Sequence, residues 1–236
     1  MKMTKNIAHR GFSARYPENT MLAFEQALRA GCDGMEFDVH MTVDGQIVII
    51  HDETVNRTTN GKGAVAEMNL EQLRALDAGS GERIPTLGEY FDFVAGSYIL
   101  SNIELKNSLV RYPGMEAVVI GKVREHGLCE QIIISSFNHF SVLECKGLAP
   151  EIRCGFLTGG WPINVGAYTR QHGIECVHPE YRALTDETIA EIHGNGIEIN
   201  AYTVNDPAAM RRLASFRVAA IITDNPILLG EVLAEK

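Results

Sequence analysis

Short apolar runs alternate with amphipathic stretches along all 236 residues, and this alternation constrains the fold more than any other feature of the sequence. Several runs are rich in Ile and Val without polar alternation, which is typical of strands covered on both faces. The predicted strands are Asn6–His9, Gly34–Val39, Ile99–Leu105, Gln131–Ser135, Arg153–Leu157, Glu175–Val177, Ile197–Tyr202 and Ala219–Thr223. Most are followed by a predicted helix, at roughly 30 residues per unit, as a (β/α)8 TIM barrel requires.

We therefore predict one TIM-barrel domain over residues 1–236. An open doubly wound sheet is the alternative, but no Gly-x-Gly-x-x-Gly motif follows the first strand. One interval breaks the rhythm, because Asp44-Gly45 between two apolar runs predicts a hairpin, and polar residues follow it. We expect residues of about 42–82 to form a small insertion after the second strand, on the carboxyl-end face of the barrel.

Helix boundaries are marked by cap residues and glycines. A helix over Met21–Ala30 stops at a glycine, and Thr86 with Glu89 three residues later forms a predicted capping box. A further helix from Asn138 is expected to end at Gly147.

The composition excludes several classes of protein and partner. Apolar residues make up 45% and charged residues 22% of the chain, which excludes a disordered or fibrous protein. With 21 basic and 30 acidic residues the net charge is −9, and so acidic a surface repels nucleic acid and anionic lipid. We expect neither as a partner, and an anionic small molecule would need a local reason to bind.

No apolar run is long enough for a membrane span or a secretory signal, so we predict a cytoplasmic protein without stable membrane anchoring. The cysteines are odd in number and never spaced as Cys-x-x-Cys, which predicts buried free thiols and no structural zinc site. They are Cys32, Cys129, Cys145, Cys154 and Cys176. The sequence makes no prediction about oligomeric state.

Polar side chains gather at the ends of the first three predicted strands and of the hairpin. They are His9, Arg10, Glu36, Asp38, His51, Glu104 and Lys106. Residues two apart on a strand point to one face, and neighbouring strand ends in a barrel are about 5 Å apart. These side chains can therefore converge on one pocket.

Three carboxylates in one pocket repel each other unless a cation lies between them. Ligands that are all oxygen favour Mg²⁺ or Ca²⁺ over zinc. The alternative is that Glu36 and Asp38 form an ion network with Arg10 and Lys106 without a metal.

The chain has eight histidines, and His9 and His51 differ from the others because each directly follows an apolar strand run. His40 shares a face with Glu36 and is expected at the rim of the pocket. His178 ends the sixth strand, where it could line the site. The remaining histidines are assigned structural roles; they are His126, His139, His172 and His193.

Other chemistries fit poorly. The Gly-x-Ser-x-Gly motif of serine hydrolases is absent, and Asn60-Gly61-Lys62-Gly63 lacks the spacing of a phosphate-binding loop and predicts a turn. The aromatic residues near the strand ends could form walls of a binding site or pack in the core, and packing is favoured; they are Phe12, Tyr16, Phe137 and Trp161.

In this order, the motifs resemble the glycerophosphodiester phosphodiesterase family over nearly the whole chain. They are Ala8-His9-Arg10-Gly11, Pro17-Glu18-Asn19-Thr20, Glu36-Phe37-Asp38-Val39, Thr42-x-Asp44-Gly45, Val48 to His51-Asp52, Arg57-Thr58-Thr59, Ile103-Glu104-Leu105-Lys106, Thr203-Val204-Asn205 and Ile222-Thr223-Asp224-Asn225-Pro226.

The resemblance implies a TIM barrel that cuts a glycerophosphodiester into glycerol 3-phosphate and an alcohol, using two histidines and one Mg²⁺ or Ca²⁺ ion. By motif, His9 and His51 correspond to the general acid and base. The metal ligands correspond to Glu36, Asp38 and Glu104, the phosphate-binding residues to Arg10 and Lys106, and a supporting residue to Glu18.

The chain departs from the family at one aromatic position, since Tyr202 stands where members commonly show tryptophan before Thr-Val-Asn. That change bears on the pocket for the leaving alcohol. One alternative to the family's usual reaction is a lysophospholipase D, which would need an apolar, membrane-facing rim; the acidic balance and the lack of an anchor argue against it. A second alternative is a non-catalytic barrel that binds phosphate ligands. The second alternative predicts a missing histidine or carboxylate, and none is missing.

Overall fold

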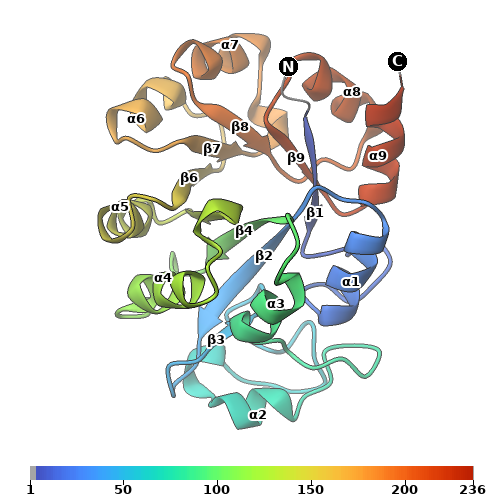
Figure 1. The fold of residues 1–236 in the computed structure, drawn as a ribbon, viewed down its shortest axis with the longest axis vertical. Helices are drawn as coiled ribbons and strands as arrows, with labels where there is room; N and C mark the ends of the chain where they lie inside the picture. The colour runs from blue at the N-terminus through green and yellow to red at the C-terminus, as the bar shows by residue number, and fades with distance from the viewer. Residues whose placement is uncertain (1–3, 236) are drawn as a thin grey trace.

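A closed ring of eight parallel strands organises the molecule (Figure 1). The computed structural model describes residues 4–235. The ring strands are β1 (Lys5–His9), β2 (Gly34–Met41), β4 (Leu100–Leu105), β5 (Ile132–Ser136), β6 (Arg153–Thr158), β7 (Cys176–Pro179), β8 (Glu198–Ala201) and β9 (Ala220–Thr223). Because β1 pairs in parallel with both β2 and β9, the sheet has no open edge within the ring. The predicted TIM barrel is confirmed, and each predicted strand overlaps one strand of the ring.

Helices surround the ring on its outer side (Figure 1). They are α1 (Met21–Arg29), α3 (Leu87–Val94), α4 (Met115–Glu125), α5 (His139–Leu148), α6 (Val165–Gln171), α7 (Asp186–Gly194), α8 (Pro207–Ser215) and α9 (Pro226–Ala234). Helix α2 (Leu70–Arg74) lies apart from the ring, in the segment between β2 and α3. The capping box of Thr86 and Glu89 is present at the start of α3. The predicted end of α5 at Gly147 is wrong by one residue, because the helix continues to Leu148 and the Ala149 amide still bonds the Cys145 carbonyl.

The segment between β2 and α3 leaves the ring and builds a small core of its own. Strand β3 (Ile47–Ile49) pairs antiparallel with β2 on the far side from the ring, which confirms the predicted hairpin, and Gly45 supplies the positive φ of its turn. The buried apolar residues of this core are Val48, Ile50, Val55, Val65, Leu73, Ala78 and Ile84. The Ile50 amide donates to the Asp38 carbonyl at 3.1 Å, so this segment holds residue 51 beside the end of β2.

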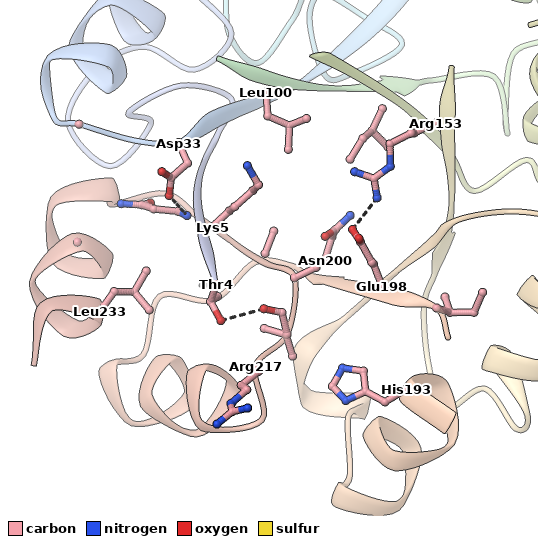
Figure 2. Close-up of a pocket in the computed structure, with 18 of the residues that line it drawn as sticks. Thr4, Lys5, Asp33, Leu100, Arg153, His193, Glu198, Asn200, Arg217 and Leu233 are labelled. Carbon is pink, nitrogen blue, oxygen red and sulfur yellow. Dashed lines mark hydrogen bonds and ion pairs between the residues drawn. The ribbon is translucent and has the colours of Figure 1, made fainter. Parts of the chain in front are cut away.

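The two ends of the barrel differ in what they display. The amino ends of the strands open into a cavity of about 750 Å³ whose wall includes Lys5, Leu100, Arg153 and Asn200 (Figure 2). The residues singled out at strand ends lie at the opposite, carboxyl end, where TIM-barrel active sites are found. The carboxyl end of the strands is therefore the expected place of the active site, although the cavity of about 750 Å³ lies at their amino ends.

Two further expectations concern the chain as a whole. All five cysteines are free, and four of them are buried, while Cys129 is partly exposed. Within residues 4–235, no helix has the length and apolar character needed to cross a membrane.

Candidate active site

The polar side chains predicted to converge do meet at the carboxyl end of β1, β2 and β4. In the sheet register His9 lies opposite Glu36, and Asp38 lies opposite Glu104. Lys106 follows directly after β4, and His51 follows the hairpin strand. The ring thus brings together residues that are up to about a hundred positions apart in the chain.

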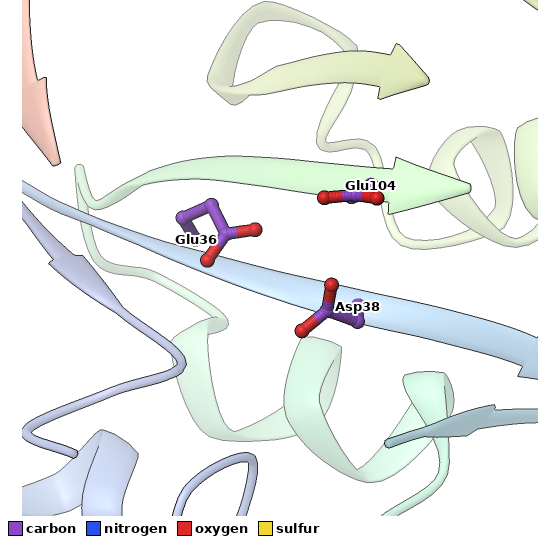
Figure 3. Close-up of side chains that lie close together, drawn as sticks. All are labelled: Glu36, Asp38 and Glu104. Carbon is purple, nitrogen blue, oxygen red and sulfur yellow. The ribbon is translucent and has the colours of Figure 1, made fainter. Parts of the chain in front are cut away.

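The three carboxylates form the centre of this site. Figure 3 shows Glu36 and Asp38 on β2 facing Glu104 on β4, and one oxygen of each lies within 4.8 Å of the others. All three are buried, with exposed fractions of 4%, 1% and 8%. Burial, together with the neighbouring carboxylates, raises the pKa of Glu36 well above its usual range and that of Glu104 to about 7.

Two cations flank the carboxylates. Lys106 Nζ lies 2.9 Å from Glu104 Oε1 and 3.7 Å from Asp38 Oδ1, and Arg10 Nε lies 3.3 Å from Asp38 Oδ2. Burial alone would raise the pKa of Asp38, but Arg10, His51 and Lys106 hold it below its usual range. Asp38 is therefore the carboxylate of the three that stays ionised most readily.

The turn after β1 aims Arg10 into the site. Arg10 adopts a left-handed backbone with φ of 55°, and its amide donates to the Glu36 carbonyl at 2.7 Å. Gly11 also has a positive φ, and a Cβ there would lie 2.7 Å from the backbone of Ala23 in α1. A glycine is thus required where the chain passes this close to the helix.

Each of the two candidate histidines is held by a carboxylate through Nδ1. His9 Nδ1 lies 2.6 Å from Asp224 Oδ1, and His51 Nδ1 lies 2.6 Å from Asp52 Oδ1. Since a carboxylate oxygen only accepts, Nδ1 carries a proton in both rings and Nε2 is left for the site. His9 Nε2 lies 3.8 Å from Glu36, and His51 Nε2 accepts from Lys106 Nζ at 3.2 Å.

The environment of His51 favours the neutral imidazole. Burial and the nearby Arg10 and Lys106 lower the pKa of His51, although Asp38 and Asp52 act in the opposite direction. A neutral ring with Nδ1–H has a free lone pair on Nε2, which is the form that can accept a proton.

Charged side chains around the site hold Arg10 and His51 in place. Glu18 accepts from Arg10 Nη1 at 2.8 Å, in agreement with its predicted supporting place. Arg57, from the segment after β3, donates both to Glu18 and to Asp52, with distances from 2.7 to 2.9 Å. One guanidinium therefore connects the residue that holds His51 with the residue that holds Arg10.

Several of these partners had no role assigned from the sequence, although they lie within the recognised motifs. They are Asn19, Asp52, Arg57 and Asp224. The signal for Asp224 was its position directly after β9, because closure of the ring places β9 beside β1 and hence Asp224 beside His9. Asn19 donates to Asp38 Oδ2 at 3.0 Å.

His178 lies in the barrel interior and is fully buried. Its ring lies between Asn102 and Asn200, 3.4 and 3.2 Å away, and burial together with Arg153 lowers its pKa to about 3. His40 is also fully buried, so its expected place at the rim is wrong. It contacts the Tyr112 hydroxyl at 2.8 Å and the His51 carbonyl at 3.1 Å.

Tyr202 stands at the side of the site nearest β6. Its hydroxyl donates to the Thr158 carbonyl at 3.1 Å, and its ring meets Phe137 edge to face at 6.2 Å. The favoured interpretation, that all four aromatic residues pack inside, is wrong for Phe137 and Trp161, which are 41% and 71% exposed. Phe12 belongs to the main core, and Tyr16 packs against it.

Comparison with known proteins matches this geometry to one family. The model of the "Glycerophosphoryl diester phosphodiesterase family" matches residues 9–228. A glycerophosphodiester phosphodiesterase of Caldanaerobacter subterraneus is 41% identical over 227 residues, which cover 93% of each chain. A phosphodiesterase structure from Oleispira antarctica, in complex with the product sn-glycerol-3-phosphate, has a TM-score of 0.89 at 29% identity and covers 98% of this chain and 97% of that one. A phosphodiesterase structure from Silicibacter pomeroyi, described as a glycerophosphoryl diester phosphodiesterase by similarity, has a TM-score of 0.90 at 28% identity, covering 98% and 93%.

Proposed function

The chain belongs to the glycerophosphoryl diester phosphodiesterase family, and we propose that it hydrolyses small glycerophosphodiesters to sn-glycerol 3-phosphate and an alcohol with the help of one divalent cation. The observation that carries this proposal is the arrangement at the carboxyl end of the barrel. Two carboxylate-held histidines face three carboxylates and two cations there. The Oleispira antarctica relative binds sn-glycerol-3-phosphate, and we extend that product to this chain.

The three buried carboxylates fit a hard divalent ion. Their donor atoms are all oxygen, which suits Mg²⁺ or Ca²⁺, and no sulfur or imidazole is needed to complete the set. Burial and mutual repulsion disfavour the ionised forms of Glu36 and Glu104, and Arg10 and Lys106 offset only part of this charge. When bound, such an ion would offset negative charge on the phosphate and make a nearby hydroxyl more acidic.

Arg10 and Lys106 are proposed to bind the phosphate oxygens. Both are partly buried cations beside the carboxylates, and fixed positive charge stabilises the growing charge of a phosphoryl transition state. Glu18 and Glu104 hold the two side chains in place.

The two histidines are proposed to move protons. One imidazole takes the proton of the substrate's glycerol 2-hydroxyl as that oxygen attacks phosphorus, and the other gives a proton to the oxygen of the leaving alcohol. A cyclic glycerol phosphate results. Water then attacks phosphorus, the histidines exchange roles, and the 2-hydroxyl is released with glycerol 3-phosphate as the product.

Glycerophosphocholine gives a direct test. The purified protein should release glycerol 3-phosphate and choline, measured by a coupled assay, and a chelator such as EDTA should stop the release. Readdition of Mg²⁺ or Ca²⁺ should restore it, and comparison of the two ions identifies the preferred metal. Hydrolysis that continues after complete chelation would disprove the metal assignment, and absence of glycerol 3-phosphate with every ion would disprove the reaction.

A further inference from the structure

Five large apolar side chains are exposed at the carboxyl end of the barrel, four on the loops after β4, β5 and β6 and one in the first turn of α5. They are Leu109, Phe137, Phe140, Trp161 and Ile163, with exposed fractions of 81%, 41%, 80%, 71% and 88%. We call these five residues the apolar rim. Single exposed apolar residues are common on soluble proteins, but a group of them on adjoining loops marks an interaction surface.

The topology places the members of the apolar rim side by side. Leu109 follows β4, Phe137 and Phe140 follow β5, and Trp161 and Ile163 follow β6. These three strands are consecutive hydrogen-bonded neighbours, so their loops leave the ring next to one another. A hollow of about 280 Å³ is lined by both the loop after β4 and Phe140. His139 Nε2, at the start of α5, bonds the Leu157 carbonyl of β6 at 2.9 Å and so joins the next two segments.

The apolar rim is continuous with the candidate active site. Phe137 touches the ring of Tyr202, and Tyr202 also bonds the end of β6 through Thr158. Burial, with the charge of Glu104 nearby, raises the pKa of Tyr202. The apolar surface therefore begins at the wall of the pocket that holds the carboxylates.

The charge of this sector differs from that of the whole chain. The loop segments at 107–114, 137–138 and 159–164 contain Arg111 and no Asp or Glu, although the net charge of the chain is −9. Glu116 and Glu144, from α4 and α5, line the hollow beside them. The repulsion expected between an acidic protein and a phosphate-bearing surface is therefore weaker at these loop tips than over the whole surface. Tryptophan, phenylalanine and leucine beside basic residues are the side chains that enter the boundary between lipid headgroups and acyl chains.

We propose that the apolar rim docks the mouth of the barrel on a lipid surface. The loops present apolar tips without carboxylates, and the glycerol-phosphate group for which the adjoining site is proposed is also the group that a phospholipid surface displays. A second copy of the chain is a poorer occupant, because two molecules of charge −9 repel and their contact would cover both mouths. Docking goes beyond the proposed reaction, and it departs from the expectation, drawn from the net charge, that anionic lipid is not a partner.

Trp161 provides a direct reporter, because it is the chain's single tryptophan. Vesicles of phosphatidylcholine mixed with phosphatidylglycerol should shift its fluorescence emission to shorter wavelength and should carry the protein upward in a flotation gradient. The double variant Phe140→Ser/Ile163→Ser keeps the reporter and should reduce vesicle partition by about tenfold or more, since two exposed apolar side chains are lost.

A control variant uses exposed apolar residues at the other end of the barrel. Tyr98 and Leu148 are 97% and 45% exposed, between α3 and β4 and at the end of α5. Tyr98→Ser/Leu148→Ser should bind vesicles as the unchanged protein does. Leu109→Ser tests a further residue of the apolar rim independently of Phe140 and Ile163. Thermal unfolding checks that each variant is folded.

Three results would overturn the proposal. These are an unchanged Trp161 emission with vesicles, equal vesicle binding by the rim variant and the unchanged protein, and an emission shift that grows with protein concentration when no lipid is present. The last result would assign the apolar rim to contact between copies. None of these measurements requires turnover, so failure of docking and failure of the proposed hydrolysis are distinguishable.

Discussion

The mouth of the barrel has a polar half and an apolar half, and they differ in how far their side chains are buried. In the polar half, formed by the ends of β1, β2 and β4 and by the segment after β3, the carboxylates are buried and each histidine has a carboxylate partner. In the apolar rim, on the loops after β4, β5 and β6, large side chains extend into solvent. This difference agrees with our proposals that the first half holds reacting groups in fixed positions and that the second offers a surface for contact.

Bringing the charged groups of the polar half together costs free energy. Three carboxylates within 4.8 Å repel one another, and burial removes the water that would otherwise solvate them. Arg10 and Lys106 compensate part of this charge, and the remainder is what a divalent ion would offset. Changes in this half should therefore alter the reaction with every substrate.

The largest effect is expected from the two histidines. His9→Ala and His51→Ala should each lower kcat by about 10²-fold or more, the usual contribution of a general acid or base. Steady-state rates on glycerophosphocholine measure this. His193→Ala is the matched control, because His193 is exposed on α7 and lines the cavity at the amino ends of the strands. Rates near that of the unchanged protein for both His9→Ala and His51→Ala would remove the proton-transfer roles.

A smaller loss is expected from Arg57, which positions His51 through Asp52 and Arg10 through Glu18. Arg57→Gln takes away the shared partner of Asp52 and Glu18, so kcat should fall by about tenfold through loosened His51 and Arg10. Because Arg57 is 48% exposed in side chain, the free energy of unfolding should change by less than about 1 kcal/mol.

Arg29→Gln is the control for this variant, since Arg29 is an exposed α1 residue paired only with Glu25. Kinetics and urea unfolding on both variants separate positioning from stability. A parallel loss of activity and stability in Arg57→Gln would give Arg57 a structural role alone.

Asp224 links the polar half to the stability of the fold. Burial opposes ionisation, but hydrogen bonds from His9, Asn205 and Ser13 lower the pKa of Asp224 to about 2. An unfolded aspartate titrates near about 3.9, so the ionised group stabilises the fold above that pH and this contribution is lost as pH falls toward 2. With Asp224 32% exposed in side chain, solvent screening leaves about 1 kcal/mol.

Urea unfolding of the unchanged protein and of Asp224→Asn, measured at several pH values, tests this linkage. The difference in unfolding free energy should be constant above about pH 5 and should shrink as the pH falls below about 4. A difference that instead increases in acid would contradict the assigned pKa direction.

The strands and the centre of the site could be predicted because their signals are local. An Ile-rich run such as Gln131–Ser135 indicates a buried strand by itself, and a polar residue directly after such a run indicates a strand end. Partners supplied by ring closure could not be read in this way. His9 and Asp224 are 215 positions apart, and only the pairing of β1 with β9 brings them together.

The apolar rim was beyond prediction for a different reason. Aromatic side chains are usually buried, so packing is the favoured interpretation of Phe137 and Trp161, and nothing in the local sequence distinguishes them from Phe12. Their exposure depends on where the loops after β5 and β6 end. In the same way, net charge describes the whole surface and not the loop tips without Asp or Glu that the fold brings together.

The smallest effect should come from the apolar rim when the substrate is soluble in water. Phe140 is 80% exposed and Ile163 88% exposed, so Phe140→Ser/Ile163→Ser removes little buried surface and should change the free energy of unfolding by less than about 0.5 kcal/mol. Its kcat/KM for glycerophosphocholine should stay within about twofold of the unchanged enzyme, because neither side chain contacts the carboxylates or the histidines. The same kinetic and unfolding measurements check both values. A large loss with this substrate would mean that the apolar rim shapes the pocket itself, and the separation between a reacting half and a contact half would then be wrong.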